Sequence, residues 1–164
     1  MQTPEIFLQQ LTGQLKQLLH DRQIDQPLMV GIHTGGVWIA QHLHHELALE
    51  QPLSTLDISF YRDDFSRIGM HPTVKSTQLP PQVENRHIIL VDDVLHTGRT
   101  IRAAMNEIFD YGRPASIILV CLLERSGREL PIQPDIVAGH LQLEHNQHIK
   151  LTGPEPLTLE LQTL

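Results

Sequence analysis

Apolar residues recur every three or four positions through the first twenty residues of the chain. Thr3 and Pro4 are residue types that favour a helix N-cap and a first helical turn. The spacing therefore predicts an amphipathic opening helix, whose apolar stripe consists of Leu8, Leu11, Leu15 and Leu18.

Further along, short apolar runs with the composition of strands are separated by helical patterns. PLMVGIH (27–33) ends at the turn Thr34-Gly35-Gly36, after which helical spacing resumes. HIILV (87–91) and SIILVCLL (116–123) are unbroken, which is typical of strands covered on both faces. Residues 56–60 alternate between apolar and polar, which predicts a strand with one wetter face. The helical pattern between the two unbroken runs consists of Ile101, Ala104, Met105 and Ile108.

Strands that alternate with helices predict right-handed βαβ crossovers and an α/β fold, a three-layer parallel sheet with flanking helices. The length is that of one domain, so we expect residues 1–164 to form a single unit. A long stretch with neither period follows Tyr61 and predicts a flexible loop at about 62–85, of the kind that forms lids or binding arms. Frequent Pro and Gly at about 124–164 predict a small C-terminal hood.

Composition and charge narrow the class of protein. The net charge of −7 argues against a protein that mainly binds phosphate backbones nonspecifically. Cys121 is the single cysteine and lies in an apolar run, which indicates a core residue in a reducing compartment. The N-terminus lacks the pattern of a signal peptide, and no segment approaches the ~20 apolar residues that span a bilayer. We therefore expect a cytoplasmic protein that does not enter membranes.

Two adjacent carboxylates, Asp92 and Asp93, stand at the end of the predicted strand 87–91. In an open parallel sheet, ligands bind beyond the carboxyl ends of the strands, where helix N-termini offer N–H groups to anions. The turn from Thr97 to Thr100 contains a glycine and two hydroxyls that suit a phosphate. A phosphate beside two carboxylates needs a polyhydroxylated spacer, so the pattern favours a ribose 5-phosphate.

The acid pair and the turn have other interpretations. Asp92 and Asp93 could simply end a strand and cap the next helix, or one could accept a phosphoryl group; the first predicted strand, however, ends without acids. A Walker-type loop is excluded because the chain contains no G-x-x-x-x-G-K-S/T. Of the histidines in HLHHE (His42, His44 and His45), His42 and His45 lie one helical turn apart, but no clear third ligand follows. An exposed polar helix face explains them, so we assign no zinc.

The segment ILVDDVLHTGRT resembles the phosphoribosyl diphosphate (PRPP) signature of type I phosphoribosyltransferases. Further blocks, which include VGIHTGGVWIAQHL, LDISFYRDDF and RELPI, are similar to the PyrR family. Its members are bifunctional uracil phosphoribosyltransferases that also regulate pyrimidine operons by binding leader RNA. The resemblance covers roughly residues 28–134 and implies the type I phosphoribosyltransferase fold.

The resemblance implies that uracil displaces diphosphate from PRPP to give UMP. Mg²⁺ would be bound with the PRPP, near Asp92 and Asp93, and not by protein ligands alone. The two acids would hold the ribose hydroxyls and favour a cationic transition state, and Arg62 would close over the diphosphate. The diphosphate would meet Thr34, Gly35 and Gly36. The 5-phosphate would be held by Val94, Leu95, His96, Thr97, Gly98, Arg99 and Thr100.

The chain departs from the family at two places and differs from purine enzymes of the superfamily at a third. Gly35 stands where many relatives have arginine, and Ala138, Gly139 and His140 stand where relatives often have Gly-Lys-Asn. His96 replaces the acid that purine enzymes usually carry before the Thr-Gly, which favours uracil. A purine-base phosphoribosyltransferase remains an alternative.

A regulator of transcription attenuation is the other alternative, one that binds RNA and senses UMP or UTP with little enzymatic role. The lysines are few, and the arginines that would have to cluster to form an RNA surface are Arg22, Arg113, Arg125 and Arg128. The family also suggests a homodimer or larger homo-oligomer.

Overall fold

The computed structural model describes residues 1–58, 79 and 82–164. Its helices are α1 (Pro4–Asp21), α2 (Gly35–Glu46) and α4 (Arg99–Asp110). Its strands are β1 (Leu28–Ile32), β2 (Ser54–Leu56), β3 (His87–Leu95), β4 (Ser116–Arg125), β5 (Ile136–Leu141), β6 (Gln147–Thr152) and β7 (Thr158–Thr163). The opening helix begins at Pro4, as the residue types at its start predict.

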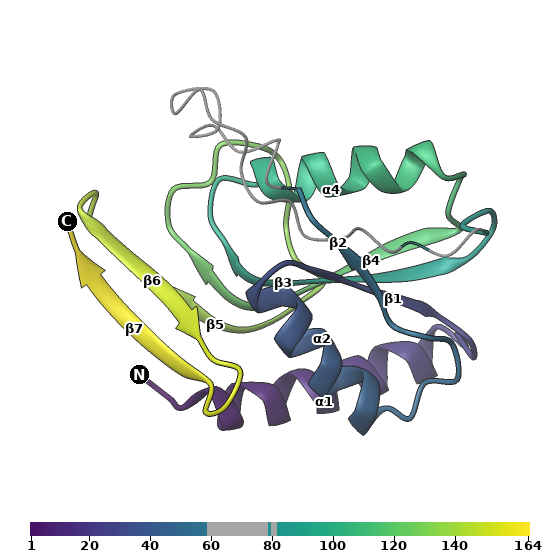
Figure 1. Ribbon diagram of the computed structural model, residues 1–164, viewed down its shortest axis with the longest axis horizontal. Helices are drawn as coiled ribbons and strands as arrows, with labels where there is room; N and C mark the ends of the chain where they lie inside the picture. Colours follow the sequence, from purple (N-terminus) through teal and green to yellow (C-terminus); the bar gives the residue numbers. More distant parts are fainter. Residues whose placement is uncertain (59–78, 80–81) are drawn as a thin grey trace.

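Strands β1 to β5 form one parallel sheet in the order β2-β1-β3-β4-β5. Helices α1 and α2 cover one face and α4 covers the other (Figure 1). The predicted three-layer α/β architecture is therefore confirmed. The strand order places β3 at the centre, between β1 and β4, so the residues that follow β3 lie in the middle of the ligand-binding edge.

The unbroken apolar run of β3 serves two cores. Ile88 and Leu90 belong to the buried cluster under α4, together with Ile101 and Ile108 of that helix. The alternate residues of β3, Ile89 and Val91, belong to the cluster under α1 and α2. Since successive side chains of a strand point to opposite faces, a strand between two helical layers has to be apolar at every position.

Strand β3 is longer than its apolar run. The sequence pattern ends the strand at Val91, whereas β3 continues to Leu95 and includes Asp92 and Asp93. The cause is the length of β4, which pairs with β3 as far as Leu95 and Glu124. Both carboxylates thus lie within β3, where Asp92 is paired with Cys121 of β4.

The predicted strand at 56–60 is only partly covered by the described residues. Strand β2 ends at Leu56, and the next two residues, Asp57 and Ile58, are buried. Arg62 and most of the predicted loop at about 62–85 lie outside the described residues, apart from 79 and 82–85.

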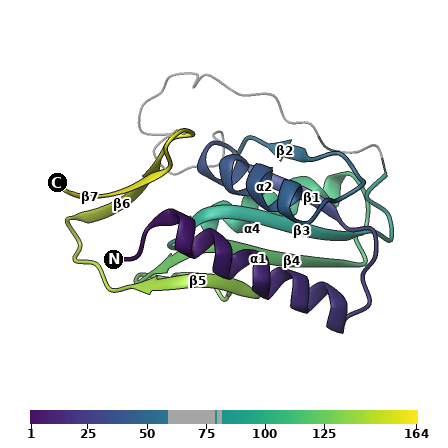
Figure 2. The same ribbon diagram turned by 90° about the horizontal axis from the view of Figure 1, so that it is seen from below.

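The segment expected to form the hood divides into two parts. Strand β5 joins the main sheet beside β4. Strands β6 and β7 form a separate antiparallel hairpin, which lies beside the start of α1 (Figure 2). Ile149 and Leu151 of β6 anchor the hairpin in the cluster that contains Phe7 of α1. None of the described helices has the length and apolar character required to cross a bilayer.

Candidate active site

The turn between β1 and α2 packs directly against the carboxylate pair. A methyl group built on Gly35 would lie 2.3 Å from Oδ2 of Asp93, and one built on Gly36 would lie 2.6 Å from the carbonyl oxygen of Val91. A side chain at Gly36 would meet the backbone of β3, and one at Gly35 would displace the carboxylate of Asp93. The glycines therefore let the start of α2 approach β3, and this contact joins the predicted diphosphate residues to the predicted ribose residues.

The two carboxylates differ in their surroundings. Asp92 is 6% exposed, and its Oδ1 accepts a hydrogen bond from the backbone N–H of Asp93 at 2.8 Å. Asp93 is half-buried, and its Oδ1 accepts the N–H of Val94 at 2.7 Å while Oδ2 lies against Gly35. Burial raises the pKa of the Cys121 thiol well above its usual range, and the negative charge of Asp92 adds to the effect. Asp92 is thus the deeper carboxylate and Asp93 the one nearer the turn.

The predicted phosphate turn lies between β3 and α4. Gly98 has a φ of 94°, in the left-handed region that favours glycine, and immediately precedes the first residue of α4. Thr97 Oγ1 accepts the N–H of Arg99 at 3.1 Å, which fixes the entry into the helix. The N-terminus of α4 presents backbone N–H groups and a positive dipole end at this point. The turn is therefore suited to a phosphate.

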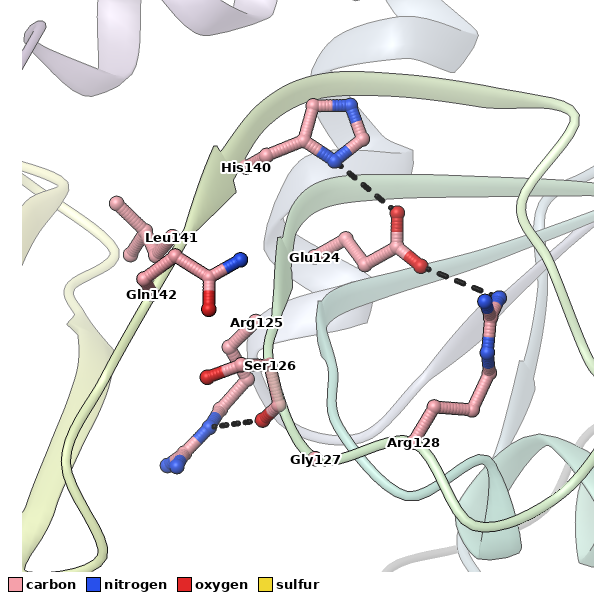
Figure 3. Close-up of a pocket in the computed structure, with 8 residues that line it drawn as sticks. All are labelled: Glu124, Arg125, Ser126, Gly127, Arg128, His140, Leu141 and Gln142. Carbon is pink, nitrogen blue, oxygen red and sulfur yellow. Dashed lines mark hydrogen bonds and ion pairs between the residues drawn. The ribbon is translucent and has the colours of Figure 1, made fainter.

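A polar pocket of about 270 Å³ lies next to this edge, at the carboxyl ends of β4 and β5 (Figure 3). Glu124 is its central charge: Oε2 lies 3.1 Å from His140 Nδ1, and Oε1 accepts a hydrogen bond from Arg128 at 3.4 Å. Glu124 pairs with Leu95 of β3 on one side and with His140 of β5 on the other. The pocket therefore lies on the strand next to β3, which carries Asp92 and Asp93.

Sequence reasoning did not select Glu124 or His140 as ligand contacts. The two residues are 16 positions apart in the sequence, which does not indicate that they lie at the ends of neighbouring strands of one parallel sheet. A polar residue at the carboxyl end of a predicted strand was the available signal, and it is weak by itself.

The four arginines proposed for an RNA surface do not gather. Arg22 pairs with Asp135 at 3.9 Å, beside the amino end of β5, and Arg113 precedes the amino end of β4. Arg125 and Arg128 lie at the opposite end of β4. Arg125 is 9% exposed and donates to the carbonyl oxygens of Ser126 and Gln147, so it holds the hairpin to the sheet.

The described residues contain no group of three or more His, Cys, Asp or Glu side chains arranged to hold a metal ion. His44, on α2, instead lies 2.7 Å through Nε2 from the carbonyl oxygen of Gln51. That contact gives it a role in holding the end of α2 to the chain that follows.

His96 provides a pH-dependent test of this region. Loss of surrounding water, followed by the positive charge of Arg125, lowers the pKa of His96 below its usual 6.5. As the pH falls through about 6.5, His96 therefore takes up a proton more readily in the unfolded chain than in the folded protein. The free energy of unfolding consequently decreases as the pH falls. We expect His96→Gln to lose less stability than the wild type between about pH 7.5 and about pH 5. Urea unfolding at both pH values measures this, and equal losses would contradict the assignment.

A family model described as "Phosphoribosyl transferase domain" matches residues 2–153 of the chain. The "Bifunctional protein PyrR" of Nitrosococcus oceani is 57% identical over 159 residues, covering 96% of this chain and 89% of that protein. The chain belongs to the PyrR family. The "Bifunctional protein PyrR" of Pseudomonas aeruginosa PAO1 is 53% identical and covers 98% of this chain and 95% of its own length.

Solved structures show the same fold as this PyrR family member. The hypoxanthine phosphoribosyltransferase of Trypanosoma cruzi in complex with IMP has a TM-score of 0.69 and 18% identity, covering 90% of this chain and 80% of its own. The purine phosphoribosyltransferase of Pyrococcus horikoshii has a TM-score of 0.62 and 20% identity, with 84% and 86% covered. At these identities the likeness shows the fold and not the base.

The structure brings most of the predicted PyrR site residues to one edge of the sheet. The turn Thr34–Gly36 contacts the end of β3, which carries Asp92 and Asp93. The segment from Val94 to Thr100 continues from those acids into α4. Arg62 lies outside the described residues, so its predicted role as a lid over diphosphate stays a prediction.

Proposed function

We propose that the chain transfers the phosphoribosyl group of PRPP to N1 of uracil, releasing diphosphate and forming UMP. The observation that carries the proposal is the contact of the β1–α2 turn with Asp93. Only the short turn between β3 and α4 separates Asp93 from the N-terminus of α4, and the chain is a PyrR family member. Three chemically different subsites, for diphosphate, ribose and phosphate, would then follow one another along the edge of the sheet.

The displacement passes through a ribose cation, so it requires positioning and charge stabilisation and no protein nucleophile. Asp92 and Asp93 hold the ribose hydroxyls in this scheme, and their negative charge favours the cationic transition state. The N–H groups of the α4 N-terminus and the hydroxyls of Thr97 and Thr100 hold the 5-phosphate. Backbone N–H groups at Thr34 to Gly36 meet the diphosphate, and Arg62 closes over it.

The donor set suits Mg²⁺ that arrives with the substrate. Carboxylate oxygens are ligands that Mg²⁺ prefers, and it keeps most of its remaining positions for water and phosphate oxygens. Asp92 and Asp93 offer two neighbouring carboxylates at the proposed ribose. Bound there with PRPP, Mg²⁺ would offset the charge of the departing diphosphate.

The pocket around Glu124 is the proposed place for the base, since it adjoins the ribose subsite on the side away from the β1–α2 turn. A carboxylate there accepts hydrogen bonds and so suits the N–H group of uracil's imide. Membership of the PyrR family favours uracil over a purine base. We also propose that the protein works in the cytoplasm, as a homodimer or larger homo-oligomer.

The direct test supplies the purified protein with PRPP, Mg²⁺ and a panel of uracil, cytosine, hypoxanthine, guanine and xanthine. We expect nucleotide to form with uracil and no other base, measured by chromatography of the products. Turnover of a purine base would overturn the uracil assignment, while failure with every base would overturn the enzyme assignment.

Leader RNA binding is the second candidate, favoured by the word "bifunctional" in the names of the relatives. The net charge of −7 and the separation of the four arginines predict weak electrostatic binding to RNA. We expect filter binding to a pyrimidine operon leader to weaken less than tenfold between about 50 and 200 mM salt, because few phosphates are contacted. A steep loss over that range would show an extensive basic interface.

A further inference from the structure

The connection between β4 and β5 contacts the predicted phosphate turn. The carbonyl oxygen of Thr97 accepts two backbone hydrogen bonds, from Glu129 at 3.0 Å and from Leu130 at 3.1 Å. Gly98 lies against the side chains of Leu130 and Ile132, since a methyl group built on it would be 3.4 Å from the Cβ of each. The backbone of this connection therefore holds the phosphate turn where it enters α4.

The same connection also holds a side chain of the turn. Arg99, the first residue of α4, donates its Nε–H to Oε1 of Glu129 at 3.0 Å. The N–H of Arg99 is bonded to Thr97 Oγ1. Glu129 thus contacts the turn twice, through its own N–H to Thr97 and through its carboxylate to Arg99.

The segment that carries Glu129 is itself anchored on the sheet. The preceding residue, Arg128, donates from Nη1 to Oε1 of Glu124 at 3.4 Å and to the carbonyl oxygen of Ile132 at 3.1 Å. A methyl group built on Gly127 would come within 2.8 Å of Nε2 of His96, so this part of the connection also contacts the residue before the turn. The contacts of Arg128 and Gly127 therefore hold the backbone next to Glu129, whose carboxylate bonds to Arg99.

We propose that Glu129 is a positioning residue for the 5-phosphate subsite, where it holds the guanidinium of Arg99 at the rim of the turn. The inference rests on the proposed function. A free arginine side chain loses much rotamer freedom when it binds a phosphate, and an arginine already held by Glu129 has lost part of that freedom beforehand.

The negative charge of Glu129 acts in the opposite direction, because it repels a phosphate. Two substitutions separate the effects. Glu129→Gln keeps an oxygen that accepts the Nε–H of Arg99 and removes the charge, whereas Glu129→Ala removes both. The exposed fractions of Arg99 and Glu129 are 47% and 52%, so the pair contributes modestly and the effects are several-fold.

The test measures binding of two probes by calorimetry: ribose 5-phosphate for the phosphate turn and Mg²⁺-diphosphate for the β1–α2 turn. We expect Glu129→Ala to weaken ribose 5-phosphate about three- to fivefold, with the affinity for diphosphate unchanged. Glu129→Gln is expected to bind ribose 5-phosphate at least as tightly as the wild type. In an Arg99→Ala background, Glu129→Ala is expected to produce no further weakening, because the group that Glu129 positions is gone.

Each other outcome has a distinct meaning. Tighter binding of ribose 5-phosphate by Glu129→Ala would show that Glu129 acts only as a repelling charge and would overturn the inference. Equal weakening of both probes would indicate a general structural role and would also overturn it. A wild type that binds neither probe contradicts the proposed function itself. The control is Glu155→Ala, an exposed glutamate before β7, which is expected to match the wild type with both probes.

Discussion

Replacing Asp93 by asparagine is expected to lower kcat/KM for UMP formation by about 10²- to 10³-fold. Asparagine has the same shape and keeps an oxygen for the N–H of Val94, so the backbone bond at 2.7 Å survives. What is lost is the negative charge nearest the β1–α2 turn, and removal of one preorganised electrostatic group typically has an effect of this size. Steady-state kinetics with saturating uracil and varied PRPP measure the loss.

Asp92→Asn tests the deeper carboxylate separately, and the double variant tests the pair. The single change is expected to lower the rate less than Asp93→Asn, because Asp92 is 6% exposed and the carboxylate that lies against Gly35 belongs to Asp93. Asp110→Asn, at the exposed end of α4, is the matched control and is expected to retain the wild-type rate. A double variant that synthesises nucleotide at nearly the wild-type rate would contradict the role of both acids.

Adding a methyl group at Gly36 is expected to destabilise the fold by about 3 kcal/mol. The new Cβ would lie 2.6 Å from the carbonyl oxygen of Val91 and 3.1 Å from Cα of Asp92, both backbone atoms of β3. The start of α2 has to move away from the sheet, and overpacking of this kind usually costs about 1–3 kcal/mol or more. Urea unfolding of Gly36→Ala measures the change.

Gly35→Ala, one residue earlier, is expected to behave differently. Its Cβ would meet Oδ2 and Cγ of Asp93 at 2.3 and 2.8 Å, in a side chain that can rotate, and Cβ of Asp93 at 3.0 Å. Stability is therefore expected to stay within about 1 kcal/mol of the wild type, while UMP formation falls at least about tenfold because the carboxylate is displaced. Gly13→Ala is the control, since no atom lies within 4 Å of the added methyl group and a helix interior favours alanine. Equal effects at Gly35 and Gly36 would contradict this account.

The fold could be predicted from local pattern because each apolar run reflects its burial directly. The unbroken run of β3 indicates a strand covered on both faces, and the structure places it at the centre of the sheet. The end of β3 could not be predicted in the same way. Asp92 and Asp93 are polar, and they are in the strand only because β4 is long enough to pair with β3 beyond them, as far as Leu95.

The site could be predicted in type but not in arrangement. Asp92, Asp93 and the Thr97–Thr100 turn are contiguous, so their proximity follows from the chain itself. The contact of Gly35 with Asp93 depends on β1 being the neighbour of β3, which no local pattern specifies. The position of Glu129 depends in the same way on the path of the β4–β5 connection.

The central claim is that the β1–α2 turn, the acid pair and the turn before α4 form one PRPP site. A crystal structure of the protein soaked with PRPP and Mg²⁺ tests it most directly. We expect the 5-phosphate at Thr97–Thr100, the ribose hydroxyls on the carboxylates of Asp92 and Asp93, and the diphosphate at Thr34–Gly36. An empty edge under saturating PRPP, or a sugar bound with its hydroxyls away from both acids, would contradict the account.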